Sequence, residues 1–226
     1  MPDLTAMTWN IQNLFPVGHV DGPATQQEYD DKVAGLAEVI NAVEPDVLAL
    51  QEVGPEHVLA DLDAACSIDF DNRLVGSPDG RGIRVALLSP RLLSNRVDIT
   101  TFPLGVVPVQ SRDLIFDNPA TPENEALSAV LGRGVLSATV RAGGVQVTVM
   151  VAHLKSKLIS YARQPGVVGG SMFAPNDQGE RLRYAGYALY RRTAEAMTPA
   201  EPRSTQYLPR PATSPAMARA PGRPTR

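Results

Sequence analysis

Apolar and polar positions alternate along most of the chain in the pattern of interleaved strands and helices. The elements predicted for the first half are a strand at 4–11, a helix at 26–43, a strand at 47–50, a helix after Pro55, a strand at 83–89 and a weaker one at 96–102. The apolar face of the first helix is expected to consist of Tyr29, Val33, Leu36, Ala37, Ile40 and Val43. Residues 47–50 are continuously apolar, which predicts a strand covered on both faces.

The pattern in the second half of the sequence predicts a hairpin and a long helix. Residues 134–141 and 145–153 flank Gly143 and Gly144, a pair that suits a tight turn. The stretch 103–132 is expected to be a surface excursion with a short helix near 123–131. A helix is expected from the Asp177 region to about residue 198, with an inward face of Leu182, Ala185, Leu189 and Ala196. The sum is an α/β fold with antiparallel pairs rather than a doubly wound parallel sheet.

Composition divides the chain near Thr198. The last 28 residues contain seven of the 20 prolines and five arginines with one acid, so that segment carries +4 and residues 1–198 carry −7 of the total −3. A segment of this composition cannot bury enough apolar surface to order itself. We therefore expect one domain at 1–198 and a disordered tail at 199–226.

Other simple counts exclude several classes of protein. No run approaches the ~18 apolar residues of a transmembrane helix. The single cysteine, Cys66, excludes an internal disulfide and a multi-cysteine metal site. No secretory signal is visible at the N-terminus. The expectation is a soluble cytoplasmic protein, and nothing in the sequence signals an oligomer.

Three polar side chains lie where predicted strands end: Asn10 interrupts the first strand, Glu52 follows the apolar run 47–50, and His153 ends the strand at 145–153. Each has an ordinary structural explanation: a turn asparagine, a solvated glutamate, and a histidine bonded to a backbone carbonyl. Taken together, three such groups at strand ends indicate one cleft. A carboxylate at the mouth of a buried strand suits a hard cation such as Mg²⁺, and Lys155 beside His153 suits an anionic group.

Four segments carry a family resemblance. Residues 8–14 (TWNIQNL), 46–53 (DVLALQEV), 82–88 (GIRVALL) and 151–157 (VAHLKSK) resemble, in this order, the endonuclease/exonuclease/phosphatase superfamily, the DNase-I-like group. The resemblance covers about residues 4–198. It implies a four-layered α/β sandwich whose C-terminal part is incomplete.

The resemblance also implies a Mg²⁺- or Mn²⁺-dependent phosphoesterase of the nuclease, phosphodiesterase or phosphatase type. Glu52 matches the family's metal ligand, Asn10 the asparagine beside metal and phosphate, and His153 the histidine at the scissile phosphate. Arg81 and Lys155 are candidate cations on the substrate side. The substrate class stays open among nucleic acid, phospholipid and sugar phosphate, although a charge of −7 argues against a broad electrostatic grip on DNA.

The departure from the family concerns its general base. The Gly-Asp-x-Asn and Ser-Asp-His motifs that follow the histidine motif in the family are absent from this sequence. We therefore predict a hydrolase that is weak or inactive as the chain stands, with a non-catalytic remnant or a phosphate-binding module as the alternatives. We interpret the tail as a shifted reading frame or a truncated gene product, and a genuine disordered tail is the alternative.

Overall fold

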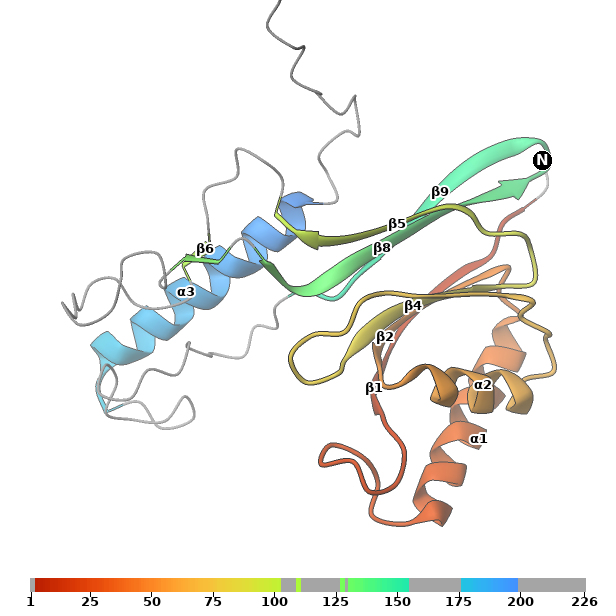
Figure 1. Cartoon of the computed structure of the whole chain (residues 1–226), viewed down its shortest axis with the longest axis horizontal. Coiled ribbons are helices and arrows are strands. Elements are labelled where there is room, and N and C mark those ends of the chain that lie inside the picture. The colour runs from red at the N-terminus through yellow and green to blue at the C-terminus, as the bar shows by residue number, and fades with distance from the viewer. Residues whose placement is uncertain (1–2, 103–108, 111–126, 129, 155–175, 199–226) are drawn as a thin grey trace, which may run out of the picture.

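The computed structural model describes residues 3–102, 109–110, 127–128, 130–154 and 176–198, and Figure 1 shows its course. Its elements are β1 (Ala6–Leu14), α1 (Gln26–Val43), β2 (Val47–Val53), α2 (Glu56–Ala65), β3 (Asn72–Val75), β4 (Arg84–Ser89), β5 (Ser94–Thr101), β6 (Val109–Gln110), β7 (Leu127–Ser128), β8 (Val130–Ala142), β9 (Val145–Ala152) and α3 (Gln178–Met197). One sheet has the strand order β1-β2-β4-β3, a second has the order β5-β8-β9, and β6 pairs with β7. The pair β1–β2 is parallel, and the other pairs are antiparallel.

Helix α1 has the bounds that its apolar periodicity predicts. It begins at a capping box, in which Thr25 and Glu28 each accept a hydrogen bond from the other's backbone N–H. Its buried face consists of Tyr29, Val33, Leu36, Ala37 and Ile40. The expectation that Val43 belongs to this face is wrong: the residue is 42% exposed, since it lies in the last turn before the left-handed Glu44.

Strand β2 lies between two hydrophobic cores. Leu48 and Leu50 pack in the cluster formed with α1 and α2, whereas Val47 and Ala49 pack in the cluster formed with the second sheet. Successive side chains of a strand point to opposite faces, so both faces of β2 are buried. The prediction of a doubly covered strand at 47–50 is confirmed, and Figure 1 shows the sheet between the two helices and the second sheet.

The second sheet is built on the predicted hairpin. Strands β8 and β9 pair from Val135 and Ala152 to Ala142 and Val145, and Gly143 and Gly144 make the turn with φ of 52° and 87°. Leu136, Ala138, Val140 and Val151 point toward the first sheet. The expected α/β fold class, with two packed sheets and antiparallel pairing, is confirmed.

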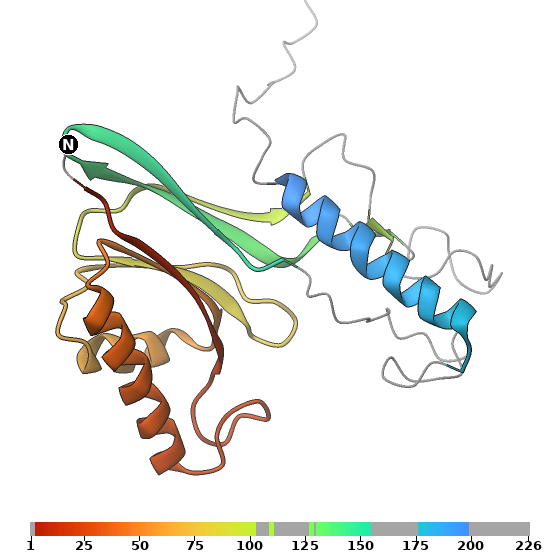
Figure 2. The ribbon, with the colours of Figure 1, turned by 180° about the vertical axis from the view of Figure 1, so that it is seen from behind.

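Helix α3 contacts one end of the second sheet (Figure 2). The prediction of its inward face is wrong: Leu182 is 71% exposed and Leu189 is 67% exposed, and Ala185 and Ala196 are exposed too. The buried residues that the structure describes in this helix are Ala188, Ala194 and Glu195, and Thr198 just after its end is buried too. Ala194 packs with Phe102, Leu131 and Val135, and the Glu195 carboxylate accepts the backbone N–H of Gly132 at 3.3 Å. The face of α3 that meets the second sheet is thus set by a small side chain and a polar contact, and it differs from the face that the apolar periodicity predicts.

One further expectation needs correction, and one strand was not expected. The helix expected near 123–131 is wrong where the structure describes that region, because β7 and the start of β8 are extended there and Leu131 is buried. The short strand β3 was not predicted, since its four residues give no clear alternation. The expected tail at 199–226 lies outside the described residues. Among the described helices, none is long and apolar enough to cross a membrane.

Candidate functional site

Glu52 lies where β2 loses regular pairing with both neighbouring strands. The register of β1 and β2 shifts between Asn10 and Leu14, and that of β2 and β4 shifts between Gln51 and Val53. Gln12, Asn13 and Glu52 all have left-handed backbones, with φ of 53°, 55° and 63°. Such conformations cost energy for residues other than glycine and are concentrated at functional sites. The two bulged strands bring Glu52 and the Asn10–Asn13 segment together.

Both oxygens of the Glu52 carboxylate are held from β1. The Asn10 Nδ2 donates to Oε1 at 3.0 Å, and the Asn13 backbone N–H donates to Oε2 at 3.1 Å. The Asn10 amide is itself oriented, because its Oδ1 accepts the backbone N–H of Gln12 at 2.9 Å. The convergence of Asn10 and Glu52, expected from their places at strand ends, is present in the structure.

His153 follows β9 and meets the same carboxylate. Its Nε2 lies 3.4 Å from Glu52 Oε1, and its side chain is 11% exposed. The same Nε2 lies 2.8 Å from Nη1 of Arg133 in β8. Burial, and after it the charge of Arg133, lowers the pKa of His153 to about 4, although Glu52 and Asp79 act in the opposite direction. The ring is therefore neutral near pH 7.

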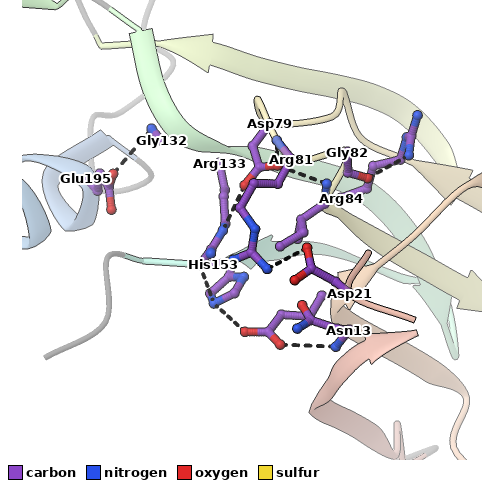
Figure 3. Close-up of polar contacts among 12 residues, drawn as sticks. Asn13, Asp21, Asp79, Arg81, Gly82, Arg84, Gly132, Arg133, His153 and Glu195 are labelled. Atoms are coloured by element: carbon purple, nitrogen blue, oxygen red, sulfur yellow. Dashed lines mark hydrogen bonds and ion pairs between the residues drawn. The ribbon is translucent and has the colours of Figure 1, made fainter. Parts of the chain in front are cut away.

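Arg133 links the histidine to the turn between β3 and β4. Its Nε donates to Asp79 Oδ2 at 3.2 Å, and the other oxygen of Asp79 accepts the backbone N–H groups of Arg81 and Ile83. The Asp79 side chain is 9% exposed, so this is a mostly buried ion pair. Figure 3 shows Asp79, Arg133 and His153 in a row.

Arg81, the cation expected on the substrate side, extends over this region and pairs with Asp21 at 2.9 Å (Figure 3). The pKa of Arg81 is raised, first by its hydrogen bond to Asp21. About half of the side chain is exposed. The other expected cation, Lys155, lies outside the described residues.

The sequence reasoning missed Arg133, Asp79 and Lys32. Lys32 of α1 donates through Nζ to the backbone carbonyls of Gln12 and Asn13 and so ties the bulged segment to the helix. Burial lowers the pKa of Lys32, while Glu52 acts to raise it. One signal was available: Lys32 lies between Tyr29 and Leu36 at helical spacing, next to the buried face.

The donor set fits a hard divalent cation. Glu52 supplies a carboxylate at 20% exposure, and the buried Asn13 Oδ1 has no hydrogen-bond partner among the described residues. The described part of the chain holds no group of three or more His, Cys, Asp and Glu side chains suited to a metal. Mg²⁺ needs no such group, since one or two carboxylates with phosphate oxygens and water complete its shell.

The comparison with family models decides the family. Residues 7–190 match the model described as Endonuclease/Exonuclease/phosphatase family. This chain belongs to that family. A search of curated proteins gave no match.

Solved structures similar to this family member include a humanized D. rerio TDP2 (20% identity, TM-score 0.42, 68% of this chain and 48% of that chain). A second is TDP2 from C. elegans (18% identity, TM-score 0.41, 68% of this chain and 36% of that chain). A third is the human Nocturnin catalytic domain with bound sulfate anion (20% identity, TM-score 0.41, 68% of this chain and 51% of that chain). The chain spans about half the length of these structures, or less.

Proposed function

We propose that residues 1–198 form a divalent-metal-dependent phosphoesterase domain that binds a phosphate group at Glu52, Asn10 and His153. The observation that carries the proposal is the Glu52 carboxylate, oriented by Asn10 and Asn13 from one sheet and facing His153 and Arg133 from the other. Membership of the Endonuclease/Exonuclease/phosphatase family supports a hydrolase of phosphate esters.

In this proposal Glu52 holds Mg²⁺ or Mn²⁺ together with Asn10, whose Oδ1 keeps a second lone pair beside the one that the Gln12 N–H occupies, and with the unpartnered Oδ1 of Asn13. The bound cation would act as a Lewis acid on a phosphoryl oxygen and offset developing negative charge. Asn10 and the Asn13 backbone keep the carboxylate oriented toward it. His153 places its neutral ring beside the phosphate, and Arg133, which contacts that ring, supplies positive charge there together with Arg81. Lys155 is kept as a proposed phosphate contact because it follows His153 by two residues.

We expect hydrolysis by this chain to be slow. The family's Gly-Asp-x-Asn and Ser-Asp-His motifs supply the group that activates water, and neither is in the sequence. A positioned general base contributes roughly 10²–10⁴-fold to the rate. The second candidate function is therefore a phosphate-ligand-binding module, which would use the same cation and anion contacts without turnover.

The test is a thermal melt of the full chain with Mg²⁺ or Mn²⁺ and inorganic phosphate, beside an assay with a generic phosphodiester. We expect cation and phosphate together to raise the Tm of the wild type, because ligands that bind the folded state stabilise it. Glu52→Ala should abolish the rise, and Glu38→Ala, an exposed glutamate of α1, should retain it.

Each outcome separates the candidates. A wild-type Tm that does not respond to cation and phosphate would contradict the proposal. Mg²⁺-dependent turnover that is lost in Glu52→Ala would establish an active enzyme and overturn the expectation of slow hydrolysis. A phosphate-dependent rise without turnover would favour the binding module.

A further inference from the structure

The contacts of His153 restrict where its ring carries a proton. Arg133 Nη1 lies 2.8 Å from His153 Nε2. A guanidinium has N–H donors and no acceptor, so the ring nitrogen at this distance has to accept. Nε2 then carries no proton, and the proton of the neutral ring is on Nδ1.

The Nδ1–H tautomer has an energetic cost, which the contact with Arg133 has to outweigh. The His153 Nδ1 is buried and has no hydrogen-bond partner among the described residues, and an unpaired buried donor is unfavourable. The other tautomer would place an N–H against the guanidinium, so two donors would face each other. Arg133 cannot easily withdraw, because its Nε is held by the mostly buried Asp79, which also caps the turn at Arg81 and Ile83.

The tautomer matters for Glu52. Nε2 of His153 lies 3.4 Å from Glu52 Oε1. If Nε2 carried the proton, a small movement would make it a donor to this oxygen. It would then occupy a lone pair that a cation needs. With Nε2 engaged by Arg133, the imidazole does not compete for the carboxylate.

We infer that Arg133, anchored by Asp79, is a positioning residue that fixes His153 as the Nδ1–H tautomer and so keeps its ring from donating to Glu52. The part of this inference that concerns cation binding rests on the proposed function. The part that concerns the tautomer rests on the contacts of Arg133, Asp79 and His153 alone. Arg133 acts through the histidine and needs no contact of its own with substrate.

The experiment is nitrogen-15 NMR of the imidazole rings in the full-length chain at neutral pH. The chain has three histidines, so variants of His19 and His57 assign the His153 signals. We expect wild-type His153 to show a protonated Nδ1 and an unprotonated Nε2. In Arg133→Met the major form should change to Nε2–H, because the facing donor is gone and Glu52 is the nearby acceptor. Arg141→Met, an exposed arginine at the other end of β8, should leave the wild-type pattern.

The wild-type spectrum decides the inference even if Arg133→Met does not fold. A major Nε2–H form in the wild type would overturn it, as would an unchanged Nδ1–H form in folded Arg133→Met. Failure of the proposed function would look different: the Tm would not respond to cation and phosphate, while the Nδ1–H tautomer and its dependence on Arg133 would stay in place.

Discussion

The three left-handed residues around the candidate cation site show how side-chain placement depends on backbone strain. Gln12, Asn13 and Glu52 have φ between 53° and 63°, and the bulges that they form direct Asn10 and Glu52 toward each other. The backbone of Gln12 has a second role, since its N–H binds Asn10 Oδ1 and its carbonyl accepts from Lys32. The exposed Gln12 side chain takes part in neither contact.

Substitutions of Gln12 can therefore measure the cost of its positive φ without removing its backbone hydrogen bonds. Gln12→Gly should leave the free energy of unfolding unchanged or raise it by up to about 1 kcal/mol, because glycine adopts positive φ without steric cost. Gln12→Val should lower it by about 1–3 kcal/mol. Urea denaturation measures both, and Ala6→Gly at an exposed position of β1 should cost about 0.5–1 kcal/mol. Equal losses for both glycine variants would contradict strain at Gln12.

His153 predicts a pH dependence of stability. Its pKa is about 4 in the folded protein and about 6.5 when exposed, so the unfolded chain binds more protons between these values. The free energy of unfolding should therefore fall as the pH falls from 6.5 to 4. Above pH 6.5 the ring is neutral in both states, so His153 should cause no pH dependence there. Melts from pH 4 to 7.5 should show a weaker slope in His153→Gln, whereas His57→Gln, at an exposed position, should behave as the wild type. Parallel profiles of the wild type and His153→Gln would refute the assignment.

At the scale of elements, periodicity located the helices but did not determine which neighbour each one contacts. In α1 the apolar stripe and the buried face agree except at Val43, since the stripe packs in the core cluster that the helix shares with β2 and α2. In α3 they disagree, because the helix contacts the end of the second sheet through Ala194 and Glu195. The exposed Leu182 and Leu189 follow from that contact and not from their own hydrophobicity.

Substitutions on α3 test this orientation. Leu189→Glu should change the free energy of unfolding by less than about 0.5 kcal/mol, because the residue is 67% exposed. Ala194→Leu should lower it by about 1–3 kcal/mol, because the site is 5% exposed and a larger side chain would displace Phe102 or Val135. Chemical denaturation of both variants supplies the comparison, and the reverse order would show that α3 packs through the leucine face.

Some residues of the candidate site could be predicted from the sequence, and others could not. Asn10, Glu52 and His153 could be found from the sequence because each lies at or near the end of a recognisable strand, where polar side chains of neighbouring strands can meet. Arg133 and Asp79 could not, because one lies inside a long strand and the other in a turn. Their contact depends on how the two sheets pack, and no local pattern encodes that distance.

At the scale of the whole molecule, the site exists because two sheets share one core. Asn10 and Glu52 come from the first sheet, and Arg133 and His153 come from the second. The sheets are joined by the cluster that contains Val47, Ala49 and Leu136, and by the Asp79–Arg133 pair near the site. Loosening this interface would separate the carboxylate from the histidine.

The shared core predicts that the two sheets unfold together. Trp9, the single tryptophan, lies in β1 and reports on the first sheet. Leu136→Ala in the second sheet should lower the free energy of unfolding by about 2–5 kcal/mol, because Leu136 is fully buried. The urea midpoint seen by Trp9 fluorescence should fall together with that seen by circular dichroism, and Val145→Ala, 62% exposed, should leave both in place. An unchanged Trp9 midpoint in Leu136→Ala would mean that the sheets unfold independently.

The division of the site between the two sheets also sets the order in which it can be made on the ribosome. The β1–α1–β2 unit, with Asn10, Asn13 and Glu52, is complete about 100 residues before His153 is added. At roughly 5–20 residues per second, that interval lasts about 5–20 s. The nascent chain thus contains the complete carboxylate half of the site, with its orienting asparagines, well before the arginine and histidine that face it have been synthesised.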